Sequence, residues 1–284
     1  MTRTGNFVFV GGTEGIGRAT AINAARAGAS ILLVARNAER GAVAVEAMRA
    51  AGAKDATFLQ ADLSTIHGAA AAADDIRAWR PAIHGLMHSA MSAFSGKTVT
   101  PDGLEFAFAL QYLSRAIINR LCADALAASG DGRIVQLAGA VSYRMARPDL
   151  ADLQFEQRKW SFFKAILTTH VEGFMLLDEA ARRWSDRPIG LYAAGVASTK
   201  TKAMQDPAMP LIMRIMGRFG TSPEESATNP TRLLLDDNPP PLPAAIFKNP
   251  KLFVPSPFEV PENEAGRLWD ITTEIAARKG VHLP

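Results

Sequence analysis

Three glycines near the N-terminus have the spacing of a phosphate-binding turn. Gly11, Gly15 and Gly17 follow the apolar run Phe7–Val10 and precede an alanine-rich stretch of helical character. Glycines at a strand-to-helix junction let the backbone approach a pyrophosphate, which then lies on the amides and the positive end of the helix. The pattern predicts a dinucleotide site, the alternative being a tight turn without a ligand. The turn contains three further residues predicted to bind the cofactor, Thr13, Glu14 and Ile16.

The end of the second apolar run indicates which dinucleotide binds. About 20 residues after the turn, a carboxylate would be expected to accept a hydrogen bond from the ribose of NAD. The sequence instead has Arg36 followed by Asn37. A guanidinium can pair with a 2′-phosphate but cannot accept a hydrogen bond from a hydroxyl. Arg36 therefore favours NADP(H) over NAD(H), and the alternative is an arginine that only faces solvent.

Six short apolar runs alternate with longer helical patterns along the chain. The runs are Phe7–Val10, Ile31–Val34, Thr57–Leu59, Gly85–Met87, Ile134–Leu137 and Leu191–Ala194. Their continuously apolar character is typical of strands that helices cover on both faces. The alternation predicts an α/β fold of the Rossmann type, a doubly wound parallel sheet with helices on both faces. We expect a single domain over residues 1–284.

Later segments carry clear helix signals. Apolar side chains at spacings of three and four between Trp160 and Trp184 predict a long helix packed on the sheet. Ser222, Pro223 and Glu225 have the order of a helix cap, a first-turn proline and a capping-box glutamate. A new helix should therefore begin after Ser222.

A methionine-rich stretch lies between the last predicted strand and this cap. Residues 200–221 contain Met204, Met209, Met213 and Met216, and are interrupted by proline and glycine. We predict a short helical insertion that forms a flexible apolar lid over the substrate pocket. The alternative is a surface helix whose apolar side packs on the core.

Composition excludes several classes of protein. The 284 residues contain 31 Lys and Arg against 28 Asp and Glu, without the basic blocks that nucleic acid or a membrane surface would require. The one cysteine, Cys122, permits neither an intramolecular disulfide nor a thiolate zinc site, and the five histidines lack metal-ligand spacing. No apolar run reaches about 18 residues, and we expect no signal peptide. We expect a cytoplasmic enzyme that binds no metal, nucleic acid or membrane.

The motifs together resemble the short-chain dehydrogenase/reductase superfamily. The likeness extends from the glycine turn and Arg36 to Leu268 and Trp269 near the C-terminus. Within the family it is closest to retinol dehydrogenases and similar NADP-dependent carbonyl reductases. The resemblance implies an NADP(H)-dependent oxidoreductase. It also implies further cofactor contacts at Asp62, Leu63, Ser89, Ala90, His170, Gly195 and Thr199.

The resemblance fails at the catalytic positions. Family members use an asparagine, a serine, a tyrosine and a lysine, of which the tyrosine donates a proton to the reduced carbonyl. The matching residues here are Gln111, Gly139, Ile166 and His170, and no Tyr-xxx-Lys motif occurs in the chain. A second alignment, which places Trp160 and Lys164 at the last two positions, also lacks the tyrosine.

Without that tyrosine, the alkoxide formed by hydride transfer needs another proton source. A positioned acid typically contributes about 10²–10⁴-fold. The candidates are His170, a bound water, and an acidic hydroxyl of the substrate beside its carbonyl. His170 could alternatively support the nicotinamide ribose or simply belong to the core. A phenol held against its own carbonyl would need only orientation and hydride from the enzyme.

The missing tetrad and the apolar lid together resemble the ketoreductases that tailor aromatic polyketides. We therefore predict an NADPH-dependent ketoreductase whose partner is a polycyclic aromatic ketone. Two other classes are a catalytically silent NADP-binding sensor or scaffold and a redox-neutral isomerase or dehydratase. A covered apolar pocket would count against the sensor. The residues expected to border the substrate are Met91, Ser95, Ser142, Tyr143, Met204 and Met213.

Overall fold

One parallel sheet organises the part of the chain that the structure describes. The structure is a computed structural model, and it describes residues 2–91, 96–207, 209–238, 240 and 242–284. Within these residues the strand order is β3-β2-β1-β4-β5-β6-β7, and every neighbouring pair is parallel. The strands are β1 (Asn6–Val10), β2 (Ser30–Ala35), β3 (Asp55–Gln60), β4 (Gly85–His88), β5 (Gly132–Ala138), β6 (Ile189–Gly195) and β7 (Ala244–Phe247). The predicted doubly wound α/β sheet is confirmed, and β7 is a strand that sequence analysis missed.

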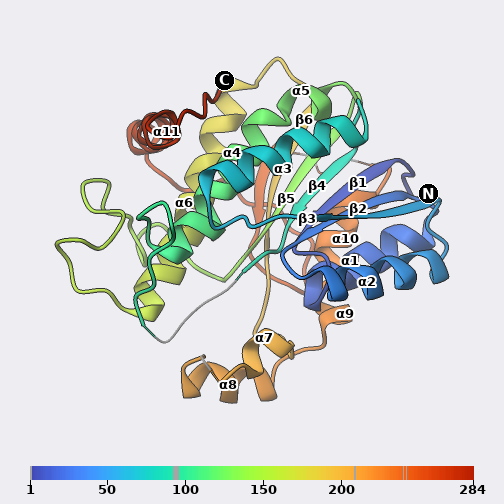
Figure 1. Cartoon of the computed structure of the whole chain (residues 1–284), viewed down its shortest axis with the longest axis horizontal. Coiled ribbons are helices and arrows are strands. Elements are labelled where there is room, and N and C mark those ends of the chain that lie inside the picture. Colours follow the sequence, from blue (N-terminus) through green and yellow to red (C-terminus); the bar gives the residue numbers. More distant parts are fainter. Residues whose placement is uncertain (1, 92–95, 208, 239, 241) are drawn as a thin grey trace.

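Helices cover both faces of the sheet (Figure 1). The first layer consists of α1 (Gly15–Arg26), α2 (Ala38–Ala50), α9 (Pro223–Ser226) and α10 (Thr228–Leu235). The second contains α3 (Ile66–Trp79), the π-helix η1 (Phe108–Leu113), α4 (Ser114–Leu121), α5 (Ala123–Ala127), α6 (Phe162–Arg183) and α11 (Glu262–Ala277). In this layer α11 packs against α6. Figure 1 shows α7 (Lys202–Gln205) and α8 (Leu211–Arg218) as a projection outside both layers.

The two faces of the sheet build separate hydrophobic cores. Because successive side chains of a strand point to opposite faces, Val8 and Val10 of β1 enter the core under α3, α4 and α6. Phe7 and Phe9 of the same strand enter the core under α1, α2 and α10. This burial on both sides explains why the strands have continuously apolar sequences.

The predicted helix starts are close to those observed. Ser161 caps α6, its hydroxyl oxygen accepting a hydrogen bond from the amide of Lys164 at 3.3 Å, so Trp160 lies before the helix. The Ser222 hydroxyl accepts from the amide of Glu225 at 3.1 Å, as the capping pattern predicts. That helix, α9, has only four residues, and α10 follows after Ala227.

A buried carboxyl group in the second layer makes the stability of the fold depend on pH. Glu172 of α6 is 2% exposed, and its Oε2 has no hydrogen-bond partner among the described residues. Burial raises the pKa of Glu172 from 4.5 to about 8, and nearby Glu105 acts in the same direction. Below pH 4.5 both folded and unfolded states hold the proton. As pH rises from about 4.5 to 8 only the unfolded state releases it, so this group destabilises the fold increasingly over that range.

We expect Glu172→Gln to stabilise the protein at pH 7.5 and to change it little at pH 5. The gain at pH 7.5 should be about 2–4 kcal/mol, because each pH unit between the two pKa values corresponds to about 1.4 kcal/mol. Urea unfolding at the two pH values measures it, and Glu156→Gln, an exposed loop position, is the control. Equal effects at both pH values would show that Glu172 is ionised in the folded protein.

Candidate active site

The glycine turn is pressed against the chain that follows β4. A side chain on Gly11, whose φ is +92°, would place its Cβ 2.3 Å from the amide nitrogen of Ala90. A Cβ on Gly17 would lie 2.1 Å from Oγ of Ser89. The amides of Ser89 and Ala90 donate to the carbonyl of Val10 at 2.8 and 2.9 Å. The structure thus brings four predicted cofactor residues together at the carboxyl ends of β1 and β4.

The first turn of α1 has the features of an anion site. Its N-cap residue, Glu14, makes no side-chain cap, and the first turn contains no acidic residue. The Glu14 carboxylate instead pairs with Arg40 at 3.0 Å and Lys202 at 3.7 Å. Uncapped amides at a helix N-terminus are suited to a phosphate. The turn therefore fits the pyrophosphate of a dinucleotide, with the Ile16 side chain buried in the core below it.

Arg36 lies beside the glycine turn. The carbonyl of Val34, two residues before it, accepts a hydrogen bond from the amide of Gly11 at 2.8 Å. The Arg36 side chain is exposed, and among the described residues no ion pair involves its guanidinium. Asn37 caps α2 by accepting from the amide of Arg40 at 2.8 Å. Arg36 is therefore the residue of this pair whose side chain can meet a 2′-phosphate.

Other predicted cofactor residues have protein partners of their own. One carboxylate oxygen of Asp62 accepts from the amide and the hydroxyl of Ser64, at 3.0 and 2.7 Å. Leu63 is buried in the core. The hydroxyl of Thr199 bonds to the carbonyl of Ala197 and to Oγ of Ser226, at 2.9 and 2.8 Å. Thr13 is half-buried in the glycine turn, and Gly195 ends β6.

Two of the four residues predicted to occupy the tetrad positions contact each other. The amide of Gly139, just after β5, donates a hydrogen bond to Nδ1 of His170 at 2.9 Å. Gln111 is buried in η1, and π-helical turns frequently mark functional sites. Ile166 is half-buried beside a small cluster that includes Phe155. The residue predicted at the proton-donor position, Ile166, is therefore apolar.

His170 is uncharged at neutral pH. Burial, together with the positive charge of Arg115, lowers the pKa of His170 from 6.5 to about 3. Since Nδ1 accepts the Gly139 hydrogen bond, the proton of the neutral ring lies on Nε2. Nε2 is buried and has no hydrogen-bond partner among the described residues. This state favours a hydrogen-bonding role for His170 over that of a general acid.

The alternative alignment places its two residues away from this contact. Lys164 lies exposed in the first turn of α6, and Trp160 precedes the helix. The indole N–H of Trp160 donates to Glu105 at 3.1 Å. The pair His170 and Gly139 is therefore the arrangement that the fold brings together.

The residues predicted to border the substrate are distributed over several segments. Met91 is 40% exposed after β4, and Ser95 lies outside the described residues. The Ser142 carbonyl accepts from two following amides, and the Tyr143 hydroxyl donates to Glu264 of α11. The hydroxyl of Tyr143 therefore has a protein partner, and burial with this contact raises its pKa to about 12. Met204 and Met213 are half-buried in the projection.

The projection exposes an apolar surface. Five side chains of α8 and its C-cap are between 47% and 83% exposed, namely Leu211, Ile212, Ile215, Met216 and Phe219. At its base, Thr201 would contact a Cβ on Gly15, whose φ is +57°. Lys202 pairs with Glu14. The predicted insertion therefore starts at the glycine turn itself.

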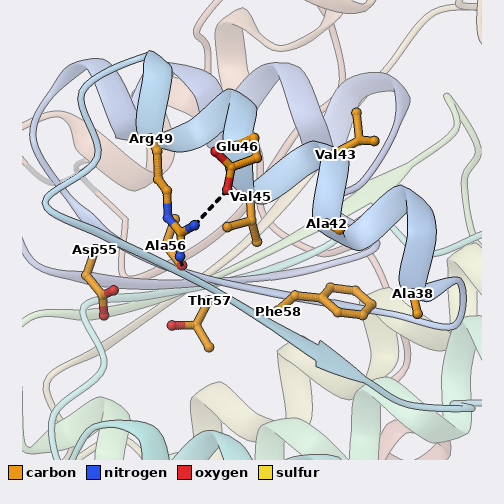
Figure 2. A pocket seen from close by; sticks show the side chains of 10 residues that line it. All are labelled: Ala38, Ala42, Val43, Val45, Glu46, Arg49, Asp55, Ala56, Thr57 and Phe58. Carbon is orange, nitrogen blue, oxygen red and sulfur yellow. Dashed lines mark hydrogen bonds and ion pairs between the residues drawn. The ribbon is translucent and has the colours of Figure 1, made fainter.

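A groove of about 670 Å³ lies at the opposite end of the strand order from β7, along the edge strand β3 (Figure 2). Figure 2 shows its floor on β3 and its wall on α2, where Arg49 pairs with Glu46 at 2.6 Å. None of the residues predicted for the cofactor, for catalysis or for the substrate lines this groove. Its lining consists of Ala38, Ala42, Val43, Val45, Glu46, Arg49, Asp55, Ala56, Thr57 and Phe58.

Within the described ranges, none of the helices combines the length and the apolar character of a membrane span. Among the same residues, no three His, Cys, Asp or Glu side chains group so that they could hold a metal ion.

Sequence analysis missed one charged residue beneath the site. Arg115 of α4 is 2% exposed and acts electrostatically on His170. It follows Gln111 by four residues, which places both on one helix face. That spacing, within an otherwise apolar stretch, was the available signal.

Comparisons with known proteins agree with this geometry. The family model described as short chain dehydrogenase matches residues 6–148. A Streptomyces sp. (strain C5) protein provisionally named daunorubicin C-13 ketoreductase DnrU is 32% identical over 194 residues, 68% of this chain and 66% of that protein. Retinol dehydrogenase 12 of Mus musculus is 25% identical over 271 residues, 94% of this chain and 85% of its own length.

Solved structures share the fold. An uncharacterised protein from Mycobacterium paratuberculosis superposes with a TM-score of 0.73 at 19% identity, covering 99% of this chain and 95% of its own. A 3-oxoacyl-(acyl-carrier-protein) reductase from Agrobacterium tumefaciens C58, solved with NADP bound, gives 0.64 at 21% identity over 82% and 87% of the two chains. With a family model matched over half its length, the chain belongs to the short-chain dehydrogenase family, an oxidoreductase family.

Proposed function

We propose that this protein is an NADPH-dependent ketoreductase that reduces a carbonyl of a polycyclic aromatic substrate, with the proton supplied by a hydroxyl of that substrate. The observation that carries the proposal is the pair formed by Ile166 and His170. The first side chain has no proton to give, and the second is an uncharged ring held by the Gly139 amide. Reduction of a ketone at this site therefore needs a proton from the ligand or from water.

The cofactor half of the site supports NADP(H). The uncapped amides of α1 would hold the pyrophosphate and Arg36 the 2′-phosphate. Structural neighbours solved with NADP, such as the 3-oxoacyl reductase, share the fold. The bound nicotinamide would supply a hydride, and the surrounding residues would orient the ketone toward it.

The substrate class is supported by two independent features. The relative with 32% identity is named as a ketoreductase of daunorubicin. The exposed apolar side chains of α8 could cover a large flat ligand, since ligand-binding grooves are among the sites that exposed apolar patches mark. The missing tetrad and this lid, residues 200–221, most resemble a simocyclinone-type angucyclinone ketoreductase.

Substrate assistance is tested by comparing ketones with and without a hydroxyl beside the carbonyl. We expect NADPH oxidation with hydroxylated polycyclic ketones to be about 10²–10⁴-fold faster than with matched deoxy compounds, since a positioned acid contributes that factor. The loss of NADPH absorbance measures both. Equal rates would exclude the substrate as proton source, and NADPH binding without turnover of any ketone would favour the sensor.

Arg36→Ala should weaken the binding of NADPH but not that of NADH. A charge-assisted contact to the 2′-phosphate is worth about 1.5–3 kcal/mol, so KM for NADPH should rise about 10–100-fold while KM for NADH stays unchanged. Steady-state kinetics with each cofactor measures the two KM values. The matched control is Arg26→Ala, an exposed arginine at the other end of α1, which should alter neither value.

The double variant Ile212→Ser and Ile215→Ser tests the lid. These side chains are 56% and 50% exposed, and burying such a side chain against a ligand is worth about 1.5–3 kcal/mol. KM for the ketone should rise at least about 10-fold without a change in NADPH binding. Val43→Ser, which alters a 67% exposed apolar residue of α2, is the control. A ketone KM that stays at the wild-type value would assign α8 to another surface role.

A further inference from the structure

Arg115 is a buried cation that has no anionic partner within the part of the chain that the structure describes. Its side chain lies between α4 and the end of β5, where Nη1 donates to the carbonyl of Leu137 at 3.3 Å. Nε and Nη2 are buried and have no hydrogen-bond partner among the described residues. No ion pair with a described carboxylate involves it, and burial lowers the pKa of Arg115 only to about 10. At neutral pH it therefore remains charged inside the fold.

The side chains around this guanidinium do not compensate its charge. Nε2 of His88 lies 2.7 Å from Oδ1 of Asn119, and because an amide oxygen only accepts, the ring carries its proton on Nε2. Gln136 is the neighbour of His88 in the sheet, and its Nε2 is buried without a partner. These residues carry no negative charge, and burial together with the positive charge of Arg115 lowers the pKa of both His88 and His170.

His170 is the imidazole that this field reaches on the α6 side. A proton added to its ring would go to Nδ1, which lies 2.9 Å from the Gly139 amide nitrogen and accepts its hydrogen bond. Two donors would then face each other, and a second positive charge would be buried near Arg115. Both the hydrogen bond and the charge therefore oppose an imidazolium at this position.

Other charged groups around His170 do not reverse this effect. On its own helix, Lys164 is exposed in the first turn, and Glu172 keeps its proton up to about pH 8. On the neighbouring segments, His88 of β4 is itself uncharged, and Glu105 accepts bonds from Trp160 and from the amide of Phe108. Arg115 is the charged group whose field acts on the His170 ring.

We propose that Arg115 is a positioning residue that holds His170 uncharged with its proton on Nε2, so that His170 donates a hydrogen bond to an oxygen of a bound ligand and no proton. The oxygen belongs either to a ribose hydroxyl of the dinucleotide or to the substrate. This inference rests on the proposed function for the identity of the ligand. The protonation state itself is a property of the protein without ligand.

Imidazole NMR of the ¹⁵N-histidine-labelled protein tests the protonation state. In the wild type, we expect His170 to show the Nε2–H tautomer and no titration between pH 5 and 8. Because the wild-type pKa is about 3, the titrations are continued down to about pH 3. In that range Arg115→Met should show the pKa of His170 raised by about one unit or more, because a nearby like charge is removed, and Arg115→Lys should leave it low. His170→Gln assigns the signal, and the exposed His67 and His282 are internal references.

Several outcomes would overturn the proposal. A wild-type His170 that titrates near pH 6.5, or that carries its proton on Nδ1, contradicts it whether or not the variants fold. A folded Arg115→Met protein, checked by circular dichroism, whose His170 pKa equals that of the wild type also contradicts it. None of these readouts depends on turnover, so they stand apart from a failure of the ketoreductase assay.

Ligand additions identify the acceptor of the Nε2–H hydrogen bond. NADP⁺ added to the wild type should shift the His170 Nε2–H signal if a ribose hydroxyl accepts. A shift that appears only when a hydroxylated polycyclic ketone joins the NADP⁺ complex assigns the acceptor to the substrate. A signal that neither addition moves, with binding confirmed by fluorescence, would make His170 a core residue and overturn the donor role.

Discussion

All seven strands run in the same direction, and this constraint gathers the site. Because their carboxyl ends meet at one edge of the sheet, the glycine turn after β1, Ser89 after β4 and Gly139 after β5 become neighbours. The packing there is too tight for a side chain on Gly11 or Gly17. Thr201 lies at the same edge, against Gly15. The base of the projection therefore contacts the glycine turn, whereas α8 extends away from that turn.

Beneath this edge the fold keeps a charge that it does not neutralise. Breaking or omitting the partner of a buried ion generally costs several kcal/mol, so Arg115 is expensive to retain. Its neighbours are polar and uncharged, and two of them, His88 and His170, have pKa values lowered to about 3. The consequence is that His88 and His170 stay uncharged over the physiological pH range.

The sequence was sufficient for the elements whose signals are local. Six strands were predictable because each is a continuous apolar run, and the cap at Ser222 follows ordinary capping chemistry. The strand β7 was missed because it directly follows a proline-rich segment, which is typical of an extended linker. The glycine turn could be predicted for the same reason as the strands, because glycines close together in the sequence determine its backbone conformation.

Contacts between distant segments could not be predicted in this way. The hydrogen bond from Gly139 to His170 joins positions 31 residues apart, and only the packing of α6 on β5 brings them together. Arg115 was missed because arginines are mostly surface residues, and its burial is a property of the layer around it. The sequence did not indicate a partner for Tyr143. In the structure its hydroxyl donates a hydrogen bond to Glu264, which lies 121 residues later in the chain.

A proton supplied by the substrate, as we propose, would explain why all four predicted tetrad positions differ from the residues that the family uses. If the ligand carries its own acid, a tyrosine at position 166 has no task, and Ile166 can fill the space with apolar surface instead. The residue at position 170 then needs no charge to lower the pKa of a tyrosine. It can instead accept a hydrogen bond from the main chain, as His170 does from the amide of Gly139. Replacing one member of a working tetrad would only remove rate, because such groups act as a unit. On the proposed mechanism, none of the four positions any longer requires the residue that the family uses. This agrees with the residues predicted at those positions, Gln111, Gly139, Ile166 and His170.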